Sequence, residues 1–362
     1  MVDSSVRRRV AVVGGGVFGC AAAYELARAG LDVTIVDRDG LASHSSGQNA
    51  GNLNALYGTP PALIPLTLEA LRIHSDVRTE LASLGCANYA MSPLKRVHLG
   101  CDDADRLELE ATHALFNSVA GFSSTWLEPN ELNGIEPQLA SDFAFGIVTA
   151  GGLRIDSYEF SHSLAAGAIA CGATVLREPV QLLTVSCDRV TGIQTSSRNF
   201  PCDEVVLATG PWIAQIKAWL GIELRIKPLK GELLLMQAPE AMAPYDFTWR
   251  TACLYRRRDN ELWVGGNWDD CGFDSAPTEN AKRALLDGAA RIMPAIRHAR
   301  LLDHIAALRP VSLSGEPIAS RANGWDNVYV ANGGGFKGVL LSVAIARRVR
   351  DLLLDKTATI QD

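Results

Sequence analysis

The chain has 362 residues, of which 48% are hydrophobic and 20% are charged, and its formal net charge is -6 at pH 7. A chain of this length exceeds what one compact core usually holds, so we expect two domains. The net negative charge argues against binding to nucleic acid or anionic lipid, because both require a cationic face. We therefore expect the ligand to be a small molecule.

Neither the cysteines nor the apolar segments indicate export or membrane insertion. The eight cysteines include no C-x-x-C pair and the histidines form no cluster at metal-ligand spacing, so we expect reduced thiols, a cytoplasmic location and no bound metal. The first apolar run is interrupted by glycines, and the last contains Arg347, Arg348 and Arg350. The sequence predicts no secretory signal and no transmembrane segment, and it leaves peripheral membrane contact open.

The first elements in the chain are a strand, a glycine-rich turn and a helix. The strand Val10–Val13 is apolar and largely β-branched, and a helical pattern of apolar residues follows the turn. In the turn, Gly14, Gly16 and Gly19 match G-x-G-x-x-G, in which the glycines permit a tight turn, approach of a pyrophosphate and close helix–strand packing. A second strand, "DVTIVD", ends at Asp37, an acid placed to bind a ribose. This pattern predicts a dinucleotide on the helix N-terminus, and it fits both NAD(P) and FAD.

The middle of the chain alternates between loops, strands and helices. Residues 43–58 ("SHSSGQNAGNLNALYG") are dense in Ser, Asn and Gly, which predicts a loop with many hydrogen-bond donors. A helix and a strand are predicted over Tyr158–Leu176, followed by a hairpin that turns near Asp188. Strands are predicted over Leu224–Trp268, and an amphipathic helix over Glu279–Met293.

Two further glycine-containing turns follow buried strands. The strand Val205–Ala208 leads into a tight turn at Thr209 and Gly210. Near the C-terminus, "NVYVANGGGFKGVLLSVAIARRVRDLLL" repeats the arrangement of strand, glycine loop and helix.

Five motifs together carry a family resemblance. They are the opening fingerprint, "SSGQNAG", "LATGPW", "LRPVSLSGEPIAS" and "GGGFKGVLLS". In this order, and over nearly the whole chain, they resemble the D-amino acid oxidase family of flavoproteins, and by length its glycine oxidase branch. The resemblance implies FAD as the cofactor. It also implies that the FAD is noncovalent, because the flavin-linking cysteine of sarcosine oxidase has no counterpart between Leu308 and Arg321.

The fold implied by the resemblance combines α/β and α+β architecture. A discontinuous Rossmann-type FAD-binding domain is expected, with an antiparallel-sheet substrate domain inserted into it. The FAD-binding domain is expected to comprise residues 1–85, 141–223 and 303–362, and the substrate-binding domain residues 86–140 and 224–302.

The resemblance also implies a set of FAD contacts. Gly335 and Gly338 would let backbone N–H groups approach the flavin pyrimidine, where reduction develops negative charge. Trp212 fits a core aromatic residue equally well. The predicted contacts are Gly14, Gly16, Phe18, Gly19, Asp37, Arg38, Ser45, Ser46, Asn49, Gly51, Val180, Thr209, Gly210, Trp212, Gly334, Gly335, Phe336, Gly338 and Val339.

Two basic residues are implied to bind the substrate carboxylate. Arg309 lies in "LRP", which in glycine and D-amino acid oxidases carries the arginine that holds this group. A surface salt bridge is the alternative for an Arg in this setting. Lys337 matches the lysine that sarcosine oxidase places beside the same carboxylate. The helix dipole disfavours Lys at a helix N-terminus, so its presence there suggests an anionic partner.

A tyrosine is the third candidate for the catalytic site. Glycine oxidase has a tyrosine at about the position of Leu254, whereas this chain has Tyr255 one residue later. Consecutive strand residues face opposite sides, so the choice of substrate is left open. The run from Arg256 to Arg258 fits either a solvated hairpin tip or a second anion site for a diacid.

The resemblance implies an FAD-dependent amino acid or amine oxidoreductase. It would oxidise the C–N bond of a small amino acid or N-substituted amino acid by hydride transfer to flavin N5, giving an imine and then a 2-oxo acid. The implied partners are a small carboxylate-bearing amine, oxygen or another electron acceptor, and a second copy or a partner subunit. The alternatives are a 2-hydroxy acid dehydrogenase of the L-2-hydroxyglutarate type and the flavin subunit of a multi-subunit opine or proline dehydrogenase.

Overall fold

A six-stranded sheet forms one end of the molecule in the computed structural model, which describes residues 7–258, without the side chain of Arg258, and residues 260–355. Its strand order is β17-β18-β11-β1-β2-β7, and every pairing is parallel except that between β17 and β18. The strands are β1 (Arg9–Val13), β2 (Asp32–Asp37), β7 (Thr174–Arg177), β11 (Glu204–Leu207), β17 (Ile318–Arg321) and β18 (Val328–Asn332).

The central strand β1 is buried on both faces, as expected for a parallel sheet. Val10 and Val12 belong to a core shared with helices, whereas Ala11 and Val13 belong to a core on the opposite face. This alternation follows from the two-residue period of a strand. The second face is covered by a three-stranded sheet and a short helix: β8 (Val180–Ser186), β9 (Arg189–Thr195), β10 (Asn199–Pro201) and α6 (Ala214–Leu220).

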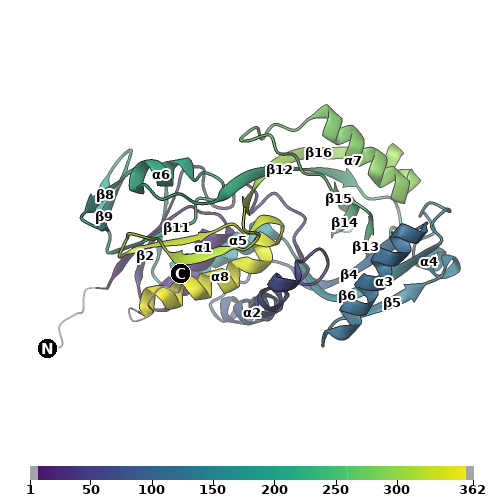
Figure 1. Ribbon diagram of the computed structural model, residues 1–362, viewed down its shortest axis with the longest axis horizontal. Coiled ribbons are helices and arrows are strands. Elements are labelled where there is room, and N and C mark those ends of the chain that lie inside the picture. Colours follow the sequence, from purple (N-terminus) through teal and green to yellow (C-terminus); the bar gives the residue numbers. More distant parts are fainter. Residues whose placement is uncertain (1–6, 259, 356–362) are drawn as a thin grey trace.

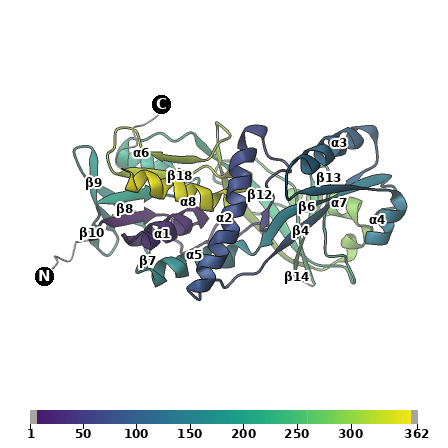
Figure 2. The ribbon, with the colours of Figure 1, turned by 90° about the horizontal axis from the view of Figure 1, so that it is seen from below.

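Helices cover the first face of the six-stranded sheet. Buried alanines at positions 21, 22 and 23 of α1 let neighbouring helices approach closely. On α2, His74 Nε2 donates to the carbonyl oxygens of Val339 and Leu340 at the start of α8, and burial lowers the pKa of His74 to about 4. In Figure 2, α2 lies at the middle of the long axis. The helices are α1 (Val17–Arg28), α2 (Ile64–Ser83), α5 (Ser157–Ala170) and α8 (Gly338–Leu354).

A curved nine-stranded sheet forms the other end of the molecule (Figure 1). Its order is β16-β12-β15-β14-β13-β4-β6-β3, and β5 pairs with β6 outside this path. The sheet is antiparallel except at β4 and β13, which pair in parallel, so the predicted antiparallel sheet contains one exception. The strands are β3 (Asn52–Leu53), β4 (Met91–Gly100), β5 (Ser123–Leu127), β6 (Phe145–Ile155), β12 (Ile226–Gln237), β13 (Asp246–Trp249), β14 (Ala252–Arg258), β15 (Glu261–Gly265) and β16 (Leu301–Ser312).

Three α-helices accompany the nine-stranded sheet. The amphipathic helix predicted over Glu279–Met293 is confirmed as α7, which is capped by the Thr278 hydroxyl and buries Leu285, Ala289 and Ile292 against the sheet. These helices are α3 (Asp103–Ser118), α4 (Pro129–Ile135) and α7 (Glu279–Ile292), and the short 3-10 helices of the chain are η1 (Pro61–Leu63), η2 (Pro294–His298) and η3 (Gly335–Lys337).

Sheet membership does not follow the predicted domain pieces everywhere. β3, β6 and most of β16 fall in pieces expected to bind FAD, yet these strands belong to the nine-stranded sheet. β6 pairs with β3 and β4, and β16 pairs with β12. The boundaries stay predictions, and residues 1–6 and 356–362 of these pieces lie outside the described part of the chain. Within the described part, no helix is long and apolar enough to cross a membrane.

Candidate active site

A cavity of about 1120 Å³ is lined by residues from both large sheets. The six-stranded sheet contributes the ends of β1, β2 and β11, and the nine-stranded sheet contributes residues of β12, β14, β16 and β4. All the predicted site residues line this cavity except Gly19. The chain thus brings together side chains that are about 300 positions apart in the sequence.

The three glycines between β1 and α1 have different structural roles. Gly14 has φ of +112°, and a Cβ there would lie 2.3 Å from the carbonyl oxygen of Ala208. At Gly19 a Cβ would lie 1.8 Å from the carbonyl oxygen of Gly14, so this glycine permits the helix to pack on the strand. Gly16 has an ordinary φ of -72°, and a Cβ there would approach only Ser46 Oγ, at 3.0 Å. Gly16 therefore keeps the cavity open at the N-terminus of α1, where backbone N–H groups favour an anion.

The loop predicted over residues 43–58 is fixed against the start of α1. Ser46 Oγ accepts a hydrogen bond from the backbone N–H of Val17 at 2.9 Å. Asn49 Nδ2 donates to the carbonyl oxygens of Ser45 and Ser46, and Asn49 Oδ1 accepts from the N–H of Gly51. These bonds order the polar loop along one wall of the cavity.

Asp37 lies at the end of β2, as the sequence predicts. Its carboxylate accepts hydrogen bonds from the backbone N–H groups of Gly15 at 2.7 Å, Asp39 at 2.8 Å and Gly40 at 2.9 Å. An ionised carboxylate has about four acceptor positions, so one further donor can be accommodated. The geometry thus leaves Asp37 able to accept a ribose hydroxyl.

Trp212 is partly exposed and lines the cavity, so it is not a core aromatic residue. The Arg38 guanidinium carbon lies 5.5 Å from the centre of the Trp212 ring, and the His44 ring lies 4.5 Å from it. Contacts of this kind stabilise a cation over an aromatic face. The cluster closes the wall of the cavity beside Asp37, and Val180 lines the same cavity.

The turn after β11 presents an unpaired hydroxyl. Thr209 Oγ1 is buried and has no hydrogen-bond partner among the described residues. Asn332 Nδ2 donates to the carbonyl oxygen of Gly210 at 2.8 Å and so holds this turn beside the end of β18. Because a buried polar group without a partner costs free energy, Thr209 is a candidate for contact with a ligand.

The glycine loop before α8 comes close to the opening turn. A Cβ at Gly334 would lie 2.8 Å from Phe18 Cζ, and Gly335 has φ of +51°. At Gly338 a Cβ would have no neighbour within 4 Å, so space remains in front of the first turn of α8. Gly338 and Val339 line the cavity there. This space fits the predicted approach of backbone N–H groups to a flat ring.

Arg309 on β16 lines the cavity beside the glycine loop, and its guanidinium carbon lies 5.2 Å from the centre of the Phe336 ring. Its Nη1 is buried with no hydrogen-bond partner, and no ion pair is formed by this side chain within the described residues. A Cβ at Gly231 on β12 would lie 1.9 Å from Arg309 Nη1, so the guanidinium occupies the space that this glycine leaves free. Burial lowers the pKa of Arg309. A surface salt bridge, the alternative for this residue, is therefore not what the structure contains.

Lys337 extends from η3 toward the loop that follows β3. Its Nζ donates to the carbonyl oxygens of Asn54 at 2.9 Å and Tyr57 at 2.7 Å, which leaves one of three donor positions. Burial, and to a lesser extent the charge of Arg96, lowers the pKa of Lys337 to about 7. Lys337 therefore changes its charge near neutral pH.

The two faces of β14 have different environments. Leu254 is fully buried in the core beneath α7, whereas Tyr255 lines the cavity. Burial raises the pKa of the Tyr255 hydroxyl, which stays protonated. Arg256 and Arg257 do not line the cavity, and Arg257 pairs with Asp156 and Glu261. The tyrosine expected near position 254 is thus one residue later here, on the face that borders the cavity.

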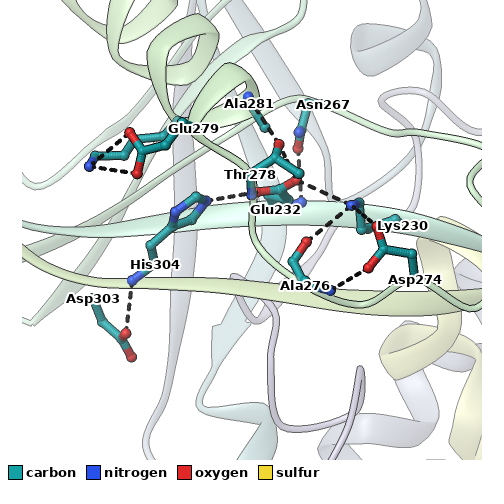
Figure 3. A network of polar contacts seen from close by, with 11 residues as sticks. Lys230, Glu232, Asn267, Asp274, Ala276, Thr278, Glu279, Ala281, Asp303 and His304 are labelled. Carbon is teal, nitrogen blue, oxygen red and sulfur yellow. Dashed lines mark hydrogen bonds and ion pairs between the residues drawn. The ribbon is translucent and has the colours of Figure 1, made fainter.

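A buried polar network holds the segment that follows β15 (Figure 3). On β12, the side chains of Lys230 and Glu232 lie on the opposite face of the sheet from position 231, because consecutive strand residues alternate between the two faces. Glu232 accepts hydrogen bonds from the backbone and hydroxyl of Thr278 and contacts His304 Nε2 at 2.7 Å. Lys230 Nζ donates to the carbonyl oxygen of Ala276. The network fixes this segment, whose Asn267 and Trp268 border the cavity.

Comparison with known proteins decides the family. The sequence profile of the DAO family, described as FAD dependent oxidoreductase, matches residues 9–352. The chain belongs to this family. It is 28% identical over 355 residues to glycine oxidase of Pseudomonas putida, which covers 96% of this chain and 94% of that protein. It is 26% identical over 411 residues to D-amino acid dehydrogenase of Paramagnetospirillum magneticum, covering 97% and 96%. Glycine oxidase from Geobacillus kaustophilus has a similar crystal structure, with a TM-score of 0.88, 25% identity and coverage of 98% and 97%.

Membership of the DAO family confirms FAD as the cofactor and the chain as an FAD-dependent oxidoreductase. Two features of the cavity fit FAD. Gly16 leaves an open cradle at the N-terminus of α1, and Thr209 offers a buried hydroxyl without a partner. The residues that would hold FAD are those predicted around β1, β2, β11 and α8. Their individual contacts, and the noncovalent attachment, stay predictions.

Arg96 is a charged residue of this oxidoreductase's cavity that the sequence motifs do not single out. Arg96 on β4 is 5% exposed, lines the cavity, and lies 3.5 Å from the carboxylate of Asp246, which also pairs with Arg154. Its guanidinium carbon lies 5.4 Å from the ring centre of Tyr57 and 5.5 Å from that of Tyr255. The signal in the sequence was a charged residue at an inward position of the strand "MSPLKRVHLG".

One group of potential metal ligands lies outside the cavity. Ligand atoms of Cys101, Asp102 and Asp105 lie within 4.8 Å of one another. Both carboxylates already bind Arg250, and Asp105 also accepts from Trp249 Nε1. These partners give the acidic residues a structural role, and the expectation of no metal stays a prediction.

Proposed function

We propose that this FAD-dependent oxidoreductase oxidises the C–N bond of a small amino acid or N-substituted amino acid. The chemistry that FAD supplies when bound is two-electron oxidation of the carbon that carries the amine, which gives an imine and, after hydrolysis, a 2-oxo acid. The protein's part is to bind and orient the substrate against the cofactor.

The unpaired guanidinium of Arg309 is the observation that carries this proposal. Arg309 contacts the Phe336 ring but has no counterion among the described residues. A buried charge without a counterion is costly, and the favoured counterion of a guanidinium is a carboxylate that can accept two parallel hydrogen bonds. Gly231 leaves the space for the guanidinium, so the arrangement is built into two paired strands. A substrate carboxylate bound there would be oriented in one plane.

Lys337 and Tyr255 would complete the binding of the substrate. Lys337 retains one donor position for the same carboxylate, and Tyr255, whose hydroxyl stays protonated beside Cys253, borders the cavity as a neutral polar group. No strong base is required of either residue, because the neutral amine is the form that reacts. The glycine oxidase and D-amino acid dehydrogenase relatives support this class of substrate.

The electron acceptor and the setting belong to the same proposal. We propose oxygen or another acceptor for the reoxidation of the cofactor, and a cytoplasmic location. All eight cysteines are free thiols, which agrees with a reducing compartment. A homo-oligomer or an assembly with a partner subunit is proposed as the alternative to a single chain.

Anaerobic reduction of the bound flavin tests the proposal. The rate should be measured with an amino acid and with the matching amine that lacks the carboxylate, in the natural protein and in Arg309→Lys. The variant keeps the charge but loses the planar fork, so we expect discrimination between the two substrates to fall by about 2 kcal/mol or more. The FAD content should stay close to that of the natural protein.

Arg250→Lys is the matched control, because Arg250 also lines the cavity but is paired with Asp102 and Asp105. This control should retain the discrimination. Unchanged discrimination in Arg309→Lys would show that Arg309 is not the anchor. Faster reduction by a 2-hydroxy acid than by the corresponding amino acid would refute oxidation of a C–N bond.

A further inference from the structure

The substrate end of the cavity holds more positive charge than one carboxylate balances. Arg309 has no ion pair within the described residues, and Lys337 donates only to backbone carbonyl oxygens. Arg96 adds a further buried cation, and the exposed Glu108 on α3 lines the same cavity. A substrate with a single carboxylate would leave part of this charge uncompensated.

Asp246 compensates Arg96 only in part. Asp246 Oδ1 accepts from Arg154 Nη2 and from the backbone N–H of Arg256, and Asp246 Oδ2 accepts from Asn52 Nδ2. The contact with Arg96 Nη2 is 3.5 Å, too long for a charge-assisted hydrogen bond of normal length. Arg96 Nε is buried and has no partner among the described residues. Arg96 is therefore a buried cation whose donors are not fully used.

The strand order of the sheet places Tyr255, on β14, between Arg309 on β16 and Arg96 on β4. A Cβ at Gly265 would lie 3.2 Å from the Tyr255 ring, and Gly231 lies under the Arg309 guanidinium. β15 pairs with both β12 and β14 and so lies between the strand of Gly231 and the strand of Tyr255. The Arg96 guanidinium carbon lies 5.5 Å from the centre of the Tyr255 ring.

We propose that the site takes an amino dicarboxylate, an amine flanked by two carboxylates, with Arg309 binding one carboxylate and Arg96 the other. This inference deepens the proposed function and rests on it. Arg309, Tyr255 and Arg96 all line the same cavity, so one small molecule can contact the three side chains. Each carboxylate supplies the planar pair of acceptors that a guanidinium matches. Arg96 is thereby a residue that determines substrate specificity.

Two ligands that cannot be oxidised at a C–N bond test this directly. Thiodiacetate carries a carboxylate on each side of a sulfur atom, and (methylthio)acetate is the same molecule without the second carboxylate. Dissociation constants are measured by titrating the FAD-loaded protein and following the change in flavin absorption. We expect thiodiacetate to bind about tenfold or more tightly, since truncating one partner of a buried charge pair has at least this effect.

Arg96→Met should reduce this ratio to within about threefold, and Arg96→Lys should give an intermediate ratio because the planar fork is lost. Arg154→Met is the matched control. It removes the same charge from the same Asp246, yet Arg154 does not line the cavity, so the ratio should stay as in the natural protein. FAD content and the urea midpoint of each variant show that it is folded.

The outcomes separate this inference from the proposed function. Equal affinity of the natural protein for the two ligands overturns the dicarboxylate inference, and so does a ratio that survives in Arg96→Met. If (methylthio)acetate still binds and loses affinity in Arg309→Lys, the proposed carboxylate anchor stands alone. If neither ligand binds, the anchor itself is wrong and the second site is refuted with it. The ratio in the natural protein and in Arg96→Lys decides the matter even if Arg96→Met does not fold.

Discussion

The two ends of the cavity are built on different principles. At the six-stranded sheet, glycines and backbone N–H groups shape the wall, and Gly14 and Gly19 leave no room for a side chain. At the nine-stranded sheet, charged side chains of β4 and β16 and the uncharged Tyr255 of β14 line the cavity, and buried Asp246 pairs with both Arg96 and Arg154. The first end depends on local backbone geometry and the second on ion pairs between distant strands. Substitutions should therefore affect cofactor retention at one end, and stability and substrate choice at the other.

The largest effect is expected at Asp246, whose side chain is fully buried. Asp246→Asn keeps the shape but leaves Arg96 and Arg154 without their counterion. Removing one partner of a buried ion pair typically costs about 3–5 kcal/mol, so the free energy of unfolding should fall by that amount. Urea denaturation monitored by tryptophan fluorescence measures it.

Asp142→Asn provides the comparison for an exposed pair. Asp142 binds Arg291, and both side chains are partly exposed, so this change should cost about 1 kcal/mol or less. Similar losses in the two variants would mean that the ion pairs at Asp246 do not stabilise the nine-stranded sheet.

A smaller effect, on cofactor rather than on folding, is expected at Gly16. The backbone there has an ordinary φ, and the nearest atom to an added Cβ is the flexible Ser46 Oγ, so Gly16→Leu should fold. The leucine side chain would occupy space intended for the cofactor, and overpacking of this kind costs about 1–3 kcal/mol. FAD should bind roughly 10 to 100 times more weakly. The flavin content after purification and the dissociation constant from reconstitution report this change.

Gly134→Leu is the matched control for Gly16→Leu. Gly134 lies in α4, and an added Cβ there would have no neighbour within 4 Å. This variant should retain FAD as the natural protein does. Normal flavin content in Gly16→Leu would place the cofactor elsewhere in the cavity.

The cofactor end could be read from the sequence because its structure is local. A strand, three glycines and a helix within one stretch of chain determine the turn, and the acid at the end of the next strand follows at a fixed distance. The strand predicted at Val205–Ala208 is β11, one residue earlier, because its position is set by pairing with β1. Here local propensity and tertiary structure agree.

The substrate end could not be read in the same way. Arg96 and Asp246 meet only because β4 and β13 pair in parallel, at positions 150 residues apart in the chain, and no local pattern encodes that pairing. The assignment of β6 to the FAD-binding piece overlooked its pairing with β4 for a similar reason. For β14, alternation limits each residue to one of two faces, but only the packing of Leu254 under α7 shows which face borders the cavity.

The smallest effect is expected from the protonation of Lys337, which should make the binding of a carboxylate ligand depend on pH. Lys337 has its pKa lowered to about 7, so it loses its charge in the folded protein as the pH rises through neutrality, whereas in the unfolded chain it keeps its proton to higher pH. Below this pKa the charged Lys337 attracts a carboxylate, and a nearby opposite charge shifts a pKa by about 1–3 units. By linkage, (methylthio)acetate should bind about tenfold more weakly at pH 9 than at pH 6.

Lys337→Met should bind this ligand with little dependence on pH, and Lys95→Met, which removes an exposed lysine of β4, should follow the natural protein. The ligand is fully ionised over this range and Arg309 stays charged, so an equal slope in Lys337→Met would assign the pH dependence to another group.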